Sequence, residues 1–220
     1  MRKTLFTASV LAMAIAAPFA QAHQAGDVIL RAGAITVDPR EDSGGVHAGG
    51  TDIGGKATLD SSTQLGLNFA YMVTDKVGIE LLAATPFTHD VGVKGLGPLD
   101  GQLGELKHLP PTLSVLYYPL GGKSAFQPYL GAGINYTWFF DTKLTSAADQ
   151  TFDGFDVQDS WGLSAQVGMD YMLTDNIMVN AQVRYIDIDT TGTTYLSGTK
   201  VKVDIDVDPF VYMVGLGYKF

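Results

Sequence analysis

The chain has 220 residues, of which 14 are basic and 23 acidic, and it contains no cysteine. Its formal net charge of −9 argues against nucleic acid as a partner, because a phosphate backbone attracts basic proteins and repels acidic ones. The absence of cysteine excludes disulfides and thiol chemistry, and we expect no cofactor.

Residues 1–22 predict a secretory signal peptide. Arg2 and Lys3 supply its positive charge, residues 5–17 are mostly apolar, and Ala20-Gln21-Ala22 has the small residues of a cleavage site. Cleavage leaves 12 of the 14 basic residues against 23 acidic ones, a net charge of −11. We expect a mature chain of one domain, residues 23–220. It has no apolar run long enough for a spanning helix, so a membrane protein of this sequence must be a β-barrel.

Apolar and small or polar residues alternate in eight segments, as in β-strands whose two faces meet different surroundings. Long Gly- or Asp-rich stretches at 38–60, 88–106 and 141–158 alternate with short turns, as do the loops and turns of bacterial outer-membrane barrels. The predicted strands are 27–37, 63–71, 77–83, 109–118, 129–138, 161–171, 179–185 and a last strand that ends at Phe220.

The last strand has the clearest alternation. Bulky residues of one parity face small residues of the other, which suits a strand with lipid outside and a crowded interior. Pairing of this strand with the first one leaves no unpaired edge in hydrocarbon. We therefore predict an all-β fold, an eight-stranded antiparallel transmembrane β-barrel. The bulky residues are Phe210, Tyr212, Val214, Leu216, Tyr218 and Phe220.

The pattern inverts beyond the predicted membrane band. The outward parity of the seventh strand continues from Tyr185 to Asp187 and Asp189, and that of the eighth leads back from Phe210 to Asp208. Beyond the same point, the residues at the inward-facing positions of both strands become apolar, and no bulge is needed to explain the change. This predicts a collar with a charged exterior and a hydrophobic lining, formed by Ile35, Val37, Ile186, Ile188, Val201, Val203, Ile205 and Val207. The pattern alone favours a packed plug over a binding tunnel there.

Other candidate sites are weaker. Residues 50–57 approach a phosphate-binding loop, but Ala57 replaces the required hydroxyl residue. We expect His47, His89 and His108 to be solvated loop residues, because they lack metal-ligand spacing. The aspartates near residues 187 and 206 are expected to pair across strands with lysines and not to bind calcium. We therefore predict no metal site.

Two functions other than transport stay open at this stage. A lipid-modifying enzyme would need a nucleophile and a base, for which Ser160 and Ser164 with a loop histidine are candidates. A structural or receptor role suits the long exposed loops. A wide water-filled porin is excluded, because eight strands enclose too little space.

Five segments resemble the OmpW family of outer-membrane proteins: 80–87, 109–113, 127–137, 159–163 and 208–220. The resemblance spans the mature chain. It implies a barrel among outer-membrane lipid and lipopolysaccharide that takes up small hydrophobic molecules passively and releases them sideways through its wall. We expect this barrel to be a monomer. It favours no catalytic residue and hence no enzyme.

With the inverted face, the resemblance predicts a channel through the collar and a lateral exit. The predicted channel-lining residues are Ile35, Val37, Leu82, Ile186, Ile188, Val201, Val203, Ile205 and Val207. The predicted exit lies at Pro86, Pro110 and Pro111, because proline cannot donate to a strand ladder and neighbouring carbonyls are expected to be unpaired.

Overall fold

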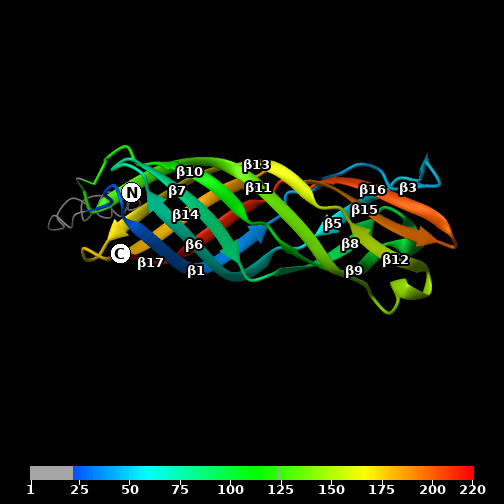
Figure 1. Ribbon diagram of the computed structural model, residues 1–220. Helices are drawn as coiled ribbons and strands as arrows, with labels where there is room; N and C mark the ends of the chain where they lie inside the picture. The colour runs from blue at the N-terminus through cyan, green and yellow to red at the C-terminus, as the bar shows by residue number, and fades with distance from the viewer. Residues whose placement is uncertain (1–21, 123) are drawn as a thin grey trace, which may run out of the picture.

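The computed structural model describes residues 22–122 and 124–220, so the predicted signal peptide before Ala22 lies outside the described residues. Eight strands close into an antiparallel barrel, and one end of the barrel continues into a collar of shorter strands (Figure 1). In order around the barrel the strands are β10 (Thr112–Tyr117), β7 (Val77–Ala84), β6 (Ser62–Met72), β1 (Val28–Asp38), β17 (Phe210–Lys219), β14 (Ile177–Ile186), β13 (Ser160–Met172) and β11 (Phe126–Leu144), which pairs with β10 again. The predicted fold class is confirmed.

The ladder between β1 and β17 closes the barrel, as the sequence predicts. It runs from Ile29 opposite Lys219 to Asp38 opposite Phe210. In its middle Gly33 lies opposite Gly215, and a Cβ atom added to Gly33 would stand 2.5 Å from the Cα atom of Gly215. Because no larger side chain fits between the two backbones, glycine is required at this crossing.

The outer face of the barrel is an apolar belt. Leu163, Val214 and Leu216 are 60–67% exposed, and each of the eight barrel strands carries at least one exposed large apolar side chain. Soluble proteins rarely expose so large a continuous apolar surface, which marks contact with lipid. Aromatic residues border the belt at both rims, as in other membrane barrels, and include Trp138, Trp161, Tyr185, Tyr212, Tyr71, Tyr117, Tyr218 and Phe220.

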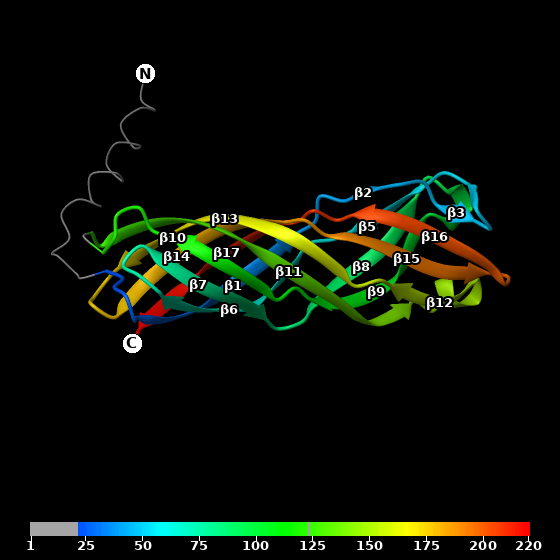
Figure 2. The ribbon, with the colours of Figure 1, turned by 45° about the horizontal axis from the view of Figure 1, so that its top comes forward.

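Two walls of short strands form the collar (Figure 2). One wall contains β5 (Lys56–Leu59), β8 (Phe87–Lys94), β9 (Gly101–Leu109) and the upper half of β11. The other contains β12 (Phe152–Val157), β15 (Asp189–Leu196), β16 (Thr199–Asp206), β2 (Asp42–Ser43), β3 (His47–Ala48) and β4 (Thr51–Asp52). Much of 88–106 and 141–158 is therefore strand, and the expectation of loops there was wrong. In β8 and β9, glycines interrupt the alternation of apolar and polar residues, but the strands still bury Val91 and Leu106.

The remaining regular segments are two 3-10 helices, η1 (Gly97–Leu99) and η2 (Ala148–Gln150). Across residues 22–122 and 124–220, no helix has the length and apolar character needed to cross a membrane.

The register of the last two long strands is continuous from barrel to collar. Tyr185 lies opposite Phe210 in the barrel, and four residues further along each strand Asp189 lies opposite Asp206 in the collar. Asp208 interrupts the strand with φ 38°, but inward and outward parity are kept on both sides of it. This confirms the prediction that the solvent changes along these strands while the register does not.

Replacement of Val214 by Lys tests the assignment of the belt. We expect a loss of about 2–4 kcal/mol in the free energy of unfolding, because the ammonium group would enter hydrocarbon. Tyr195→Lys is the control, since Tyr195 is also well exposed, at 43%, but lies on the collar; it should change stability by less than about 0.5 kcal/mol. Guanidinium unfolding in lipid vesicles measures both, and equal costs would contradict the assignment.

Candidate functional site

The interior of the barrel is divided into layers along its axis. At the end away from the collar, apolar side chains fill the lumen; these are Ala22, Ile29, Ala70, Met72, Leu116, Tyr118, Ala125, Tyr129, Met172 and Met178. Polar and charged side chains fill the next layer. Above them, a second apolar cluster extends into the collar.

Four charged residues make up the polar floor, as we call Arg31, Glu80, Asp170 and Arg184. Arg31 donates from Nε and Nη2 to the two carboxylate oxygens of Asp170, at 2.9 and 2.6 Å, and from Nη1 to Glu80 at 3.0 Å. Arg184 Nη2 donates to the other oxygen of Glu80 at 2.7 Å. The four side chains are at most 1% exposed, and their charges balance. Such pairing is what permits charges to be buried.

Neutral groups complete the polar floor and tie it to the start of the mature chain. Gln166 donates to Glu80, and the Tyr118 hydroxyl accepts from Arg31 at 2.8 Å. His23, the first residue expected after cleavage, is buried and contacts Asp170 at 2.8 Å. The floor therefore blocks a straight path through the lumen. The sequence shows one charged residue at an inward position of each of β1, β7, β13 and β14, but it does not show that these four residues meet.

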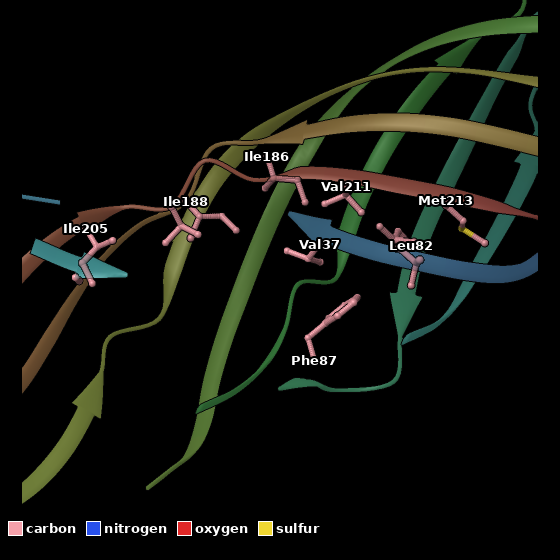
Figure 3. Packing of buried hydrophobic residues seen from close by; sticks show 11 residues of the cluster. Val37, Leu82, Phe87, Ile186, Ile188, Ile205, Val211 and Met213 are labelled. Atoms are coloured by element: carbon pink, nitrogen blue, oxygen red, sulfur yellow. The ribbon is translucent and has the colours of Figure 1, made fainter. Parts of the chain in front are cut away.

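The apolar path, as we call the upper cluster, contains most of the predicted channel-lining residues (Figure 3). Val203 packs against it and is partly buried, while Val201 is buried and borders the collar cavity. The other predicted members, Ile35, Val37, Leu82, Ile186, Ile188, Ile205 and Val207, are all buried within it. Phe87, Ala57, Val211 and Met213 also belong to it and were not predicted.

A cavity lies between the two walls of the collar, above the apolar path. It holds about 740 Å³ of space not occupied by atoms, including space open to solvent. Its lining is almost entirely apolar and includes Val46, Leu59, Val91, Leu103, Val203 and Ile205. Ile205 and Val207 belong to both the cavity lining and the apolar path, so the cavity rests directly on the apolar path.

The barrel wall has an interruption between β7 and β10, which we call the seam. The β7–β10 ladder ends at Leu82 opposite Thr112, and the β8–β9 ladder starts at Phe87 opposite His108. In the described chain, no residue of 83–86 pairs with one of 109–111. The seam contains Pro86, Pro110 and Pro111, all three of the predicted exit residues.

The carbonyls of Pro110 and Pro111 themselves are hydrogen-bonded. The buried Asn135 side chain donates from Nδ2 to both, at 3.1 and 3.2 Å. Pro110 O also accepts from the Thr112 hydroxyl at 3.1 Å, and Pro111 O from the Tyr136 amide at 3.1 Å. Donors from Thr112 and β11 thus satisfy the carbonyls of both prolines.

Two of the three candidate loop histidines are buried together beside the seam. His89 and His108 are 2% and 4% exposed, and their Nε2 atoms are 2.9 Å apart. Burial lowers the pKa of His89, and burial together with His89 holds the pKa of His108 well below its usual value. The expectation of solvated loops was wrong for this pair, because β8 and β9 form a hairpin that packs on the apolar path. His47 is exposed on β3, away from them.

The aspartates at 187, 189, 204, 206 and 208, among the described residues, form no ion pair with a lysine of another strand. Asp189 lies opposite Asp206, and Lys202 pairs with Asp204 of its own strand at 2.9 Å. The carboxylates of Asp187, Asp189 and Asp208 lie within 4.8 Å of one another. Burial first, and then the nearby carboxylates, raise the pKa of Asp189. The cross-strand pairing predicted from the sequence was therefore wrong.

The candidate nucleophiles of the enzyme hypothesis are not joined to a base. Ser160 and Ser164 are 4% and 6% exposed and lie on the side of β13 that faces the barrel lumen. Among the described hydrogen bonds of residues 22–122 and 124–220, neither serine contacts a histidine.

Comparison with known proteins gives a family match over nearly the whole mature chain. Residues 24–220 match the model of the OmpW family. Outer membrane protein W of Vibrio cholerae is 44% identical over 224 residues and covers 100% of both chains. The crystal structure of OprG from Pseudomonas aeruginosa is 54% identical, covers 91% of this chain and 98% of its own, and has a TM-score of 0.88. A more distant relative, the dibenzothiophene metabolism operon protein DoxH of Pseudomonas sp. strain C18, is 28% identical and covers 76% of each chain.

Substitution of Glu80 by Ala tests the polar floor. Both arginines lose a buried partner, so we expect a loss of about 3–5 kcal/mol in the free energy of unfolding. Glu105→Ala, which removes an exposed carboxylate from β9, should cost less than about 0.5 kcal/mol. A similar small loss for Glu80→Ala in vesicle unfolding experiments would show that the floor is not a stabilising network.

The buried histidine pair predicts that stability depends on pH. The folded pKa values lie below that of an unfolded histidine, so the stabilisation is fully present above about pH 6.5 and is lost as pH falls from there toward the folded values. The slope is at most about 1.4 kcal/mol per pH unit for each histidine. Unfolding between pH 7.5 and 5.5 should show a smaller slope for His108→Phe and an unchanged one for His47→Phe. Equal slopes for wild type and His108→Phe would refute this.

Proposed function

The chain belongs to the OmpW family of outer-membrane proteins, and from this premise we propose that it takes up small hydrophobic molecules passively through its collar and releases them sideways at the seam. Its location is the bacterial outer membrane, in agreement with its relatives and with the apolar belt.

The observation that carries the proposal is an apolar route above a closed polar floor. The collar cavity adjoins the apolar path, and both are lined or formed by aliphatic and aromatic side chains. An apolar molecule gains about 25 cal/mol for each Å² that it removes from water, so such a surface draws it away from the polar exterior. The paired charges of the floor offer it no comparable gain, and the route therefore has to end before them.

The seam is the part of the wall that suits an exit. It lies where the apolar path meets the upper part of the apolar belt, with Leu82 inside and the exposed Leu81 and Leu113 outside. Elsewhere around the barrel the strands are joined by ladders, whose separation would leave backbone groups unpaired in hydrocarbon. At the seam, a molecule passes between lumen and lipid without that cost.

The names of relatives support the class of ligand. DoxH is named for an operon of dibenzothiophene metabolism, and dibenzothiophene is a small, apolar aromatic compound. An apolar route suits a molecule of this kind. Because its lining has few polar groups, the route offers polar molecules few hydrogen-bond partners.

Substitution of Ile205 by Asp tests the route. A carboxylate without a partner in the apolar path makes it polar, and we expect uptake of dibenzothiophene to fall at least about tenfold, which needs only about 1.4 kcal/mol of added barrier. Lys200→Asp is the control, because it places the same group on the exposed side of β16. The initial rate of uptake is measured in cells with an intact lipopolysaccharide layer that lack the wild-type protein.

Folding of both variants is confirmed by the heat-dependent shift of the barrel in gel electrophoresis. If folded Ile205→Asp protein restores uptake as well as wild type does, the collar is not the route. If wild-type protein itself adds nothing to uptake, a structural or receptor role replaces transport.

Substitution of Pro110 by Val tests the exit. Valine restores the missing N–H and favours extension of the β7–β10 ladder across the seam, so we expect uptake to slow several-fold while the collar still binds the compound. Pro128→Val is matched, because Pro128 lies within the barrel part of β11, opposite Met169 and away from the seam. Equal rates for the two variants would reject lateral release at the seam.

A further inference from the structure

We propose that His108 is a polar subsite in the apolar path, and that it selects apolar molecules that carry one hydroxyl or N–H group over hydrocarbons of the same size. The inference rests on the proposed function and adds to it a ligand class. It follows from the proton positions of the histidine pair, the unpartnered nitrogen they leave, and the location of the ring.

The carbonyl of Asp60 determines the proton positions. His89 Nδ1 lies 2.6 Å from this oxygen, which can only accept, so His89 carries its proton on Nδ1. In the neutral ring, Nε2 of His89 is then an acceptor. His108 Nε2, at 2.9 Å, has to donate to it, and His108 is left with a bare Nδ1.

This Nδ1 atom is buried and has no hydrogen-bond partner. Leaving a buried acceptor unpaired costs about 1–3 kcal/mol, and such groups are uncommon in native proteins. The ring cannot relieve the cost by moving its proton to Nδ1, because it would lose the hydrogen bond to His89. Of the described residues that line the collar cavity or the cavity beside the pair, only His108 has a side-chain atom in this state.

The surroundings of the ring suit an apolar ligand. Phe87 on β8 and Phe139 on β11 lie directly across from His108 on the strands at either side of it, and both stack on it, with centroids 5.3 and 5.7 Å away. The histidine pair borders a small cavity whose other lining residues include Val37, Leu59, Leu106, Phe139, Ile188 and Val207. Four of these, Leu59, Leu106, Phe139 and Val207, also line the collar cavity, so His108 lies next to the space that a molecule in the collar would occupy.

Other polar groups on the route are already engaged. The hydroxyls of Thr190 and Thr194 donate to the carbonyls of Gln158 and Gly154. A metal site is not favoured, because within the described residues no third histidine or carboxylate joins His89 and His108 in a group of ligand atoms. What remains is a single acceptor in an aromatic setting, and its complement is a ring or chain with one donor.

Nitrogen NMR of histidine-labelled wild-type protein in nanodiscs tests the subsite without a substitution. We expect His108 to show a protonated Nε2 and a bare Nδ1, with the opposite tautomer for His89. Addition of 1-naphthol should shift the Nδ1 resonance of His108, whereas naphthalene should leave it in place. A proton on His108 Nδ1 in the free protein, or equal shifts with both compounds, would overturn the proposal.

Uptake of the same two compounds gives a second measurement. The ratio of 1-naphthol to naphthalene uptake cancels differences in protein amount, and it should fall roughly fivefold in His108→Phe, which corresponds to one hydrogen bond of about 1 kcal/mol. Phe139→Leu is matched, because it removes a stacked ring and keeps the acceptor, so its ratio should equal that of wild type.

The outcomes separate this inference from the proposed function. If wild-type protein transports naphthalene and His108→Phe keeps the wild-type ratio, the polar subsite is wrong and the route stands. If wild-type protein transports neither compound, the route itself fails. A ratio that falls equally in His108→Phe and Phe139→Leu shows that packing, and not the acceptor, sets the preference, and it overturns the subsite.

Discussion

The constraint on which this structure depends is that every backbone N–H and C=O group in hydrocarbon has to find a partner within the protein. The ladder between β1 and β17 meets it by joining the first and last strands, with Gly33 and Gly215 allowing the close approach of the two backbones. Once the barrel is closed, its wall can be interrupted only where other groups satisfy the backbone. At the seam, the amide of Asn135 and the hydroxyl of Thr112 donate to the carbonyl of Pro110, so this backbone acceptor has partners without a β7–β10 ladder.

The same strands serve two solvents, and the layers of the interior follow from this. Within the membrane the outer face has to be apolar, so charged groups are confined to the lumen, where Arg31, Glu80, Asp170 and Arg184 neutralise one another. Above the membrane the outer face has to be charged, and the apolar side chains of β16 turn inward. An apolar surface therefore forms in the collar and upper barrel, and it ends where the buried charges begin.

Alternation along a strand could be read from the sequence, and contacts between distant segments could not. The alternation of bulky and small residues from Phe210 to Phe220 predicted the barrel, its closure and the unchanged register into the collar. Side chains alternate between the two faces of a strand whatever the partner strand is. The hairpin of β8 and β9 was missed because its glycines suggested a loop. The pairing of His89 with His108 depends on that hairpin, and the bond from Asn135 to Pro110 joins residues 25 positions apart. Proline indicated where a ladder stops, but not what replaces it.

The way the seam is closed bears on how a lateral exit would work. Separation of two paired strands breaks many backbone hydrogen bonds together, each left unpaired in hydrocarbon at a cost of several kcal/mol. The seam has no such ladder, and the bonds from Asn135 to both proline carbonyls tie the segment before β10 to β11, not to β7. The exit we propose at the seam therefore requires no ladder to be broken, and the rest of the barrel stays paired. Thr137 donates to Asn135 Oδ1 at 2.7 Å, which fixes the amide so that its Nδ2 points to the two proline carbonyls.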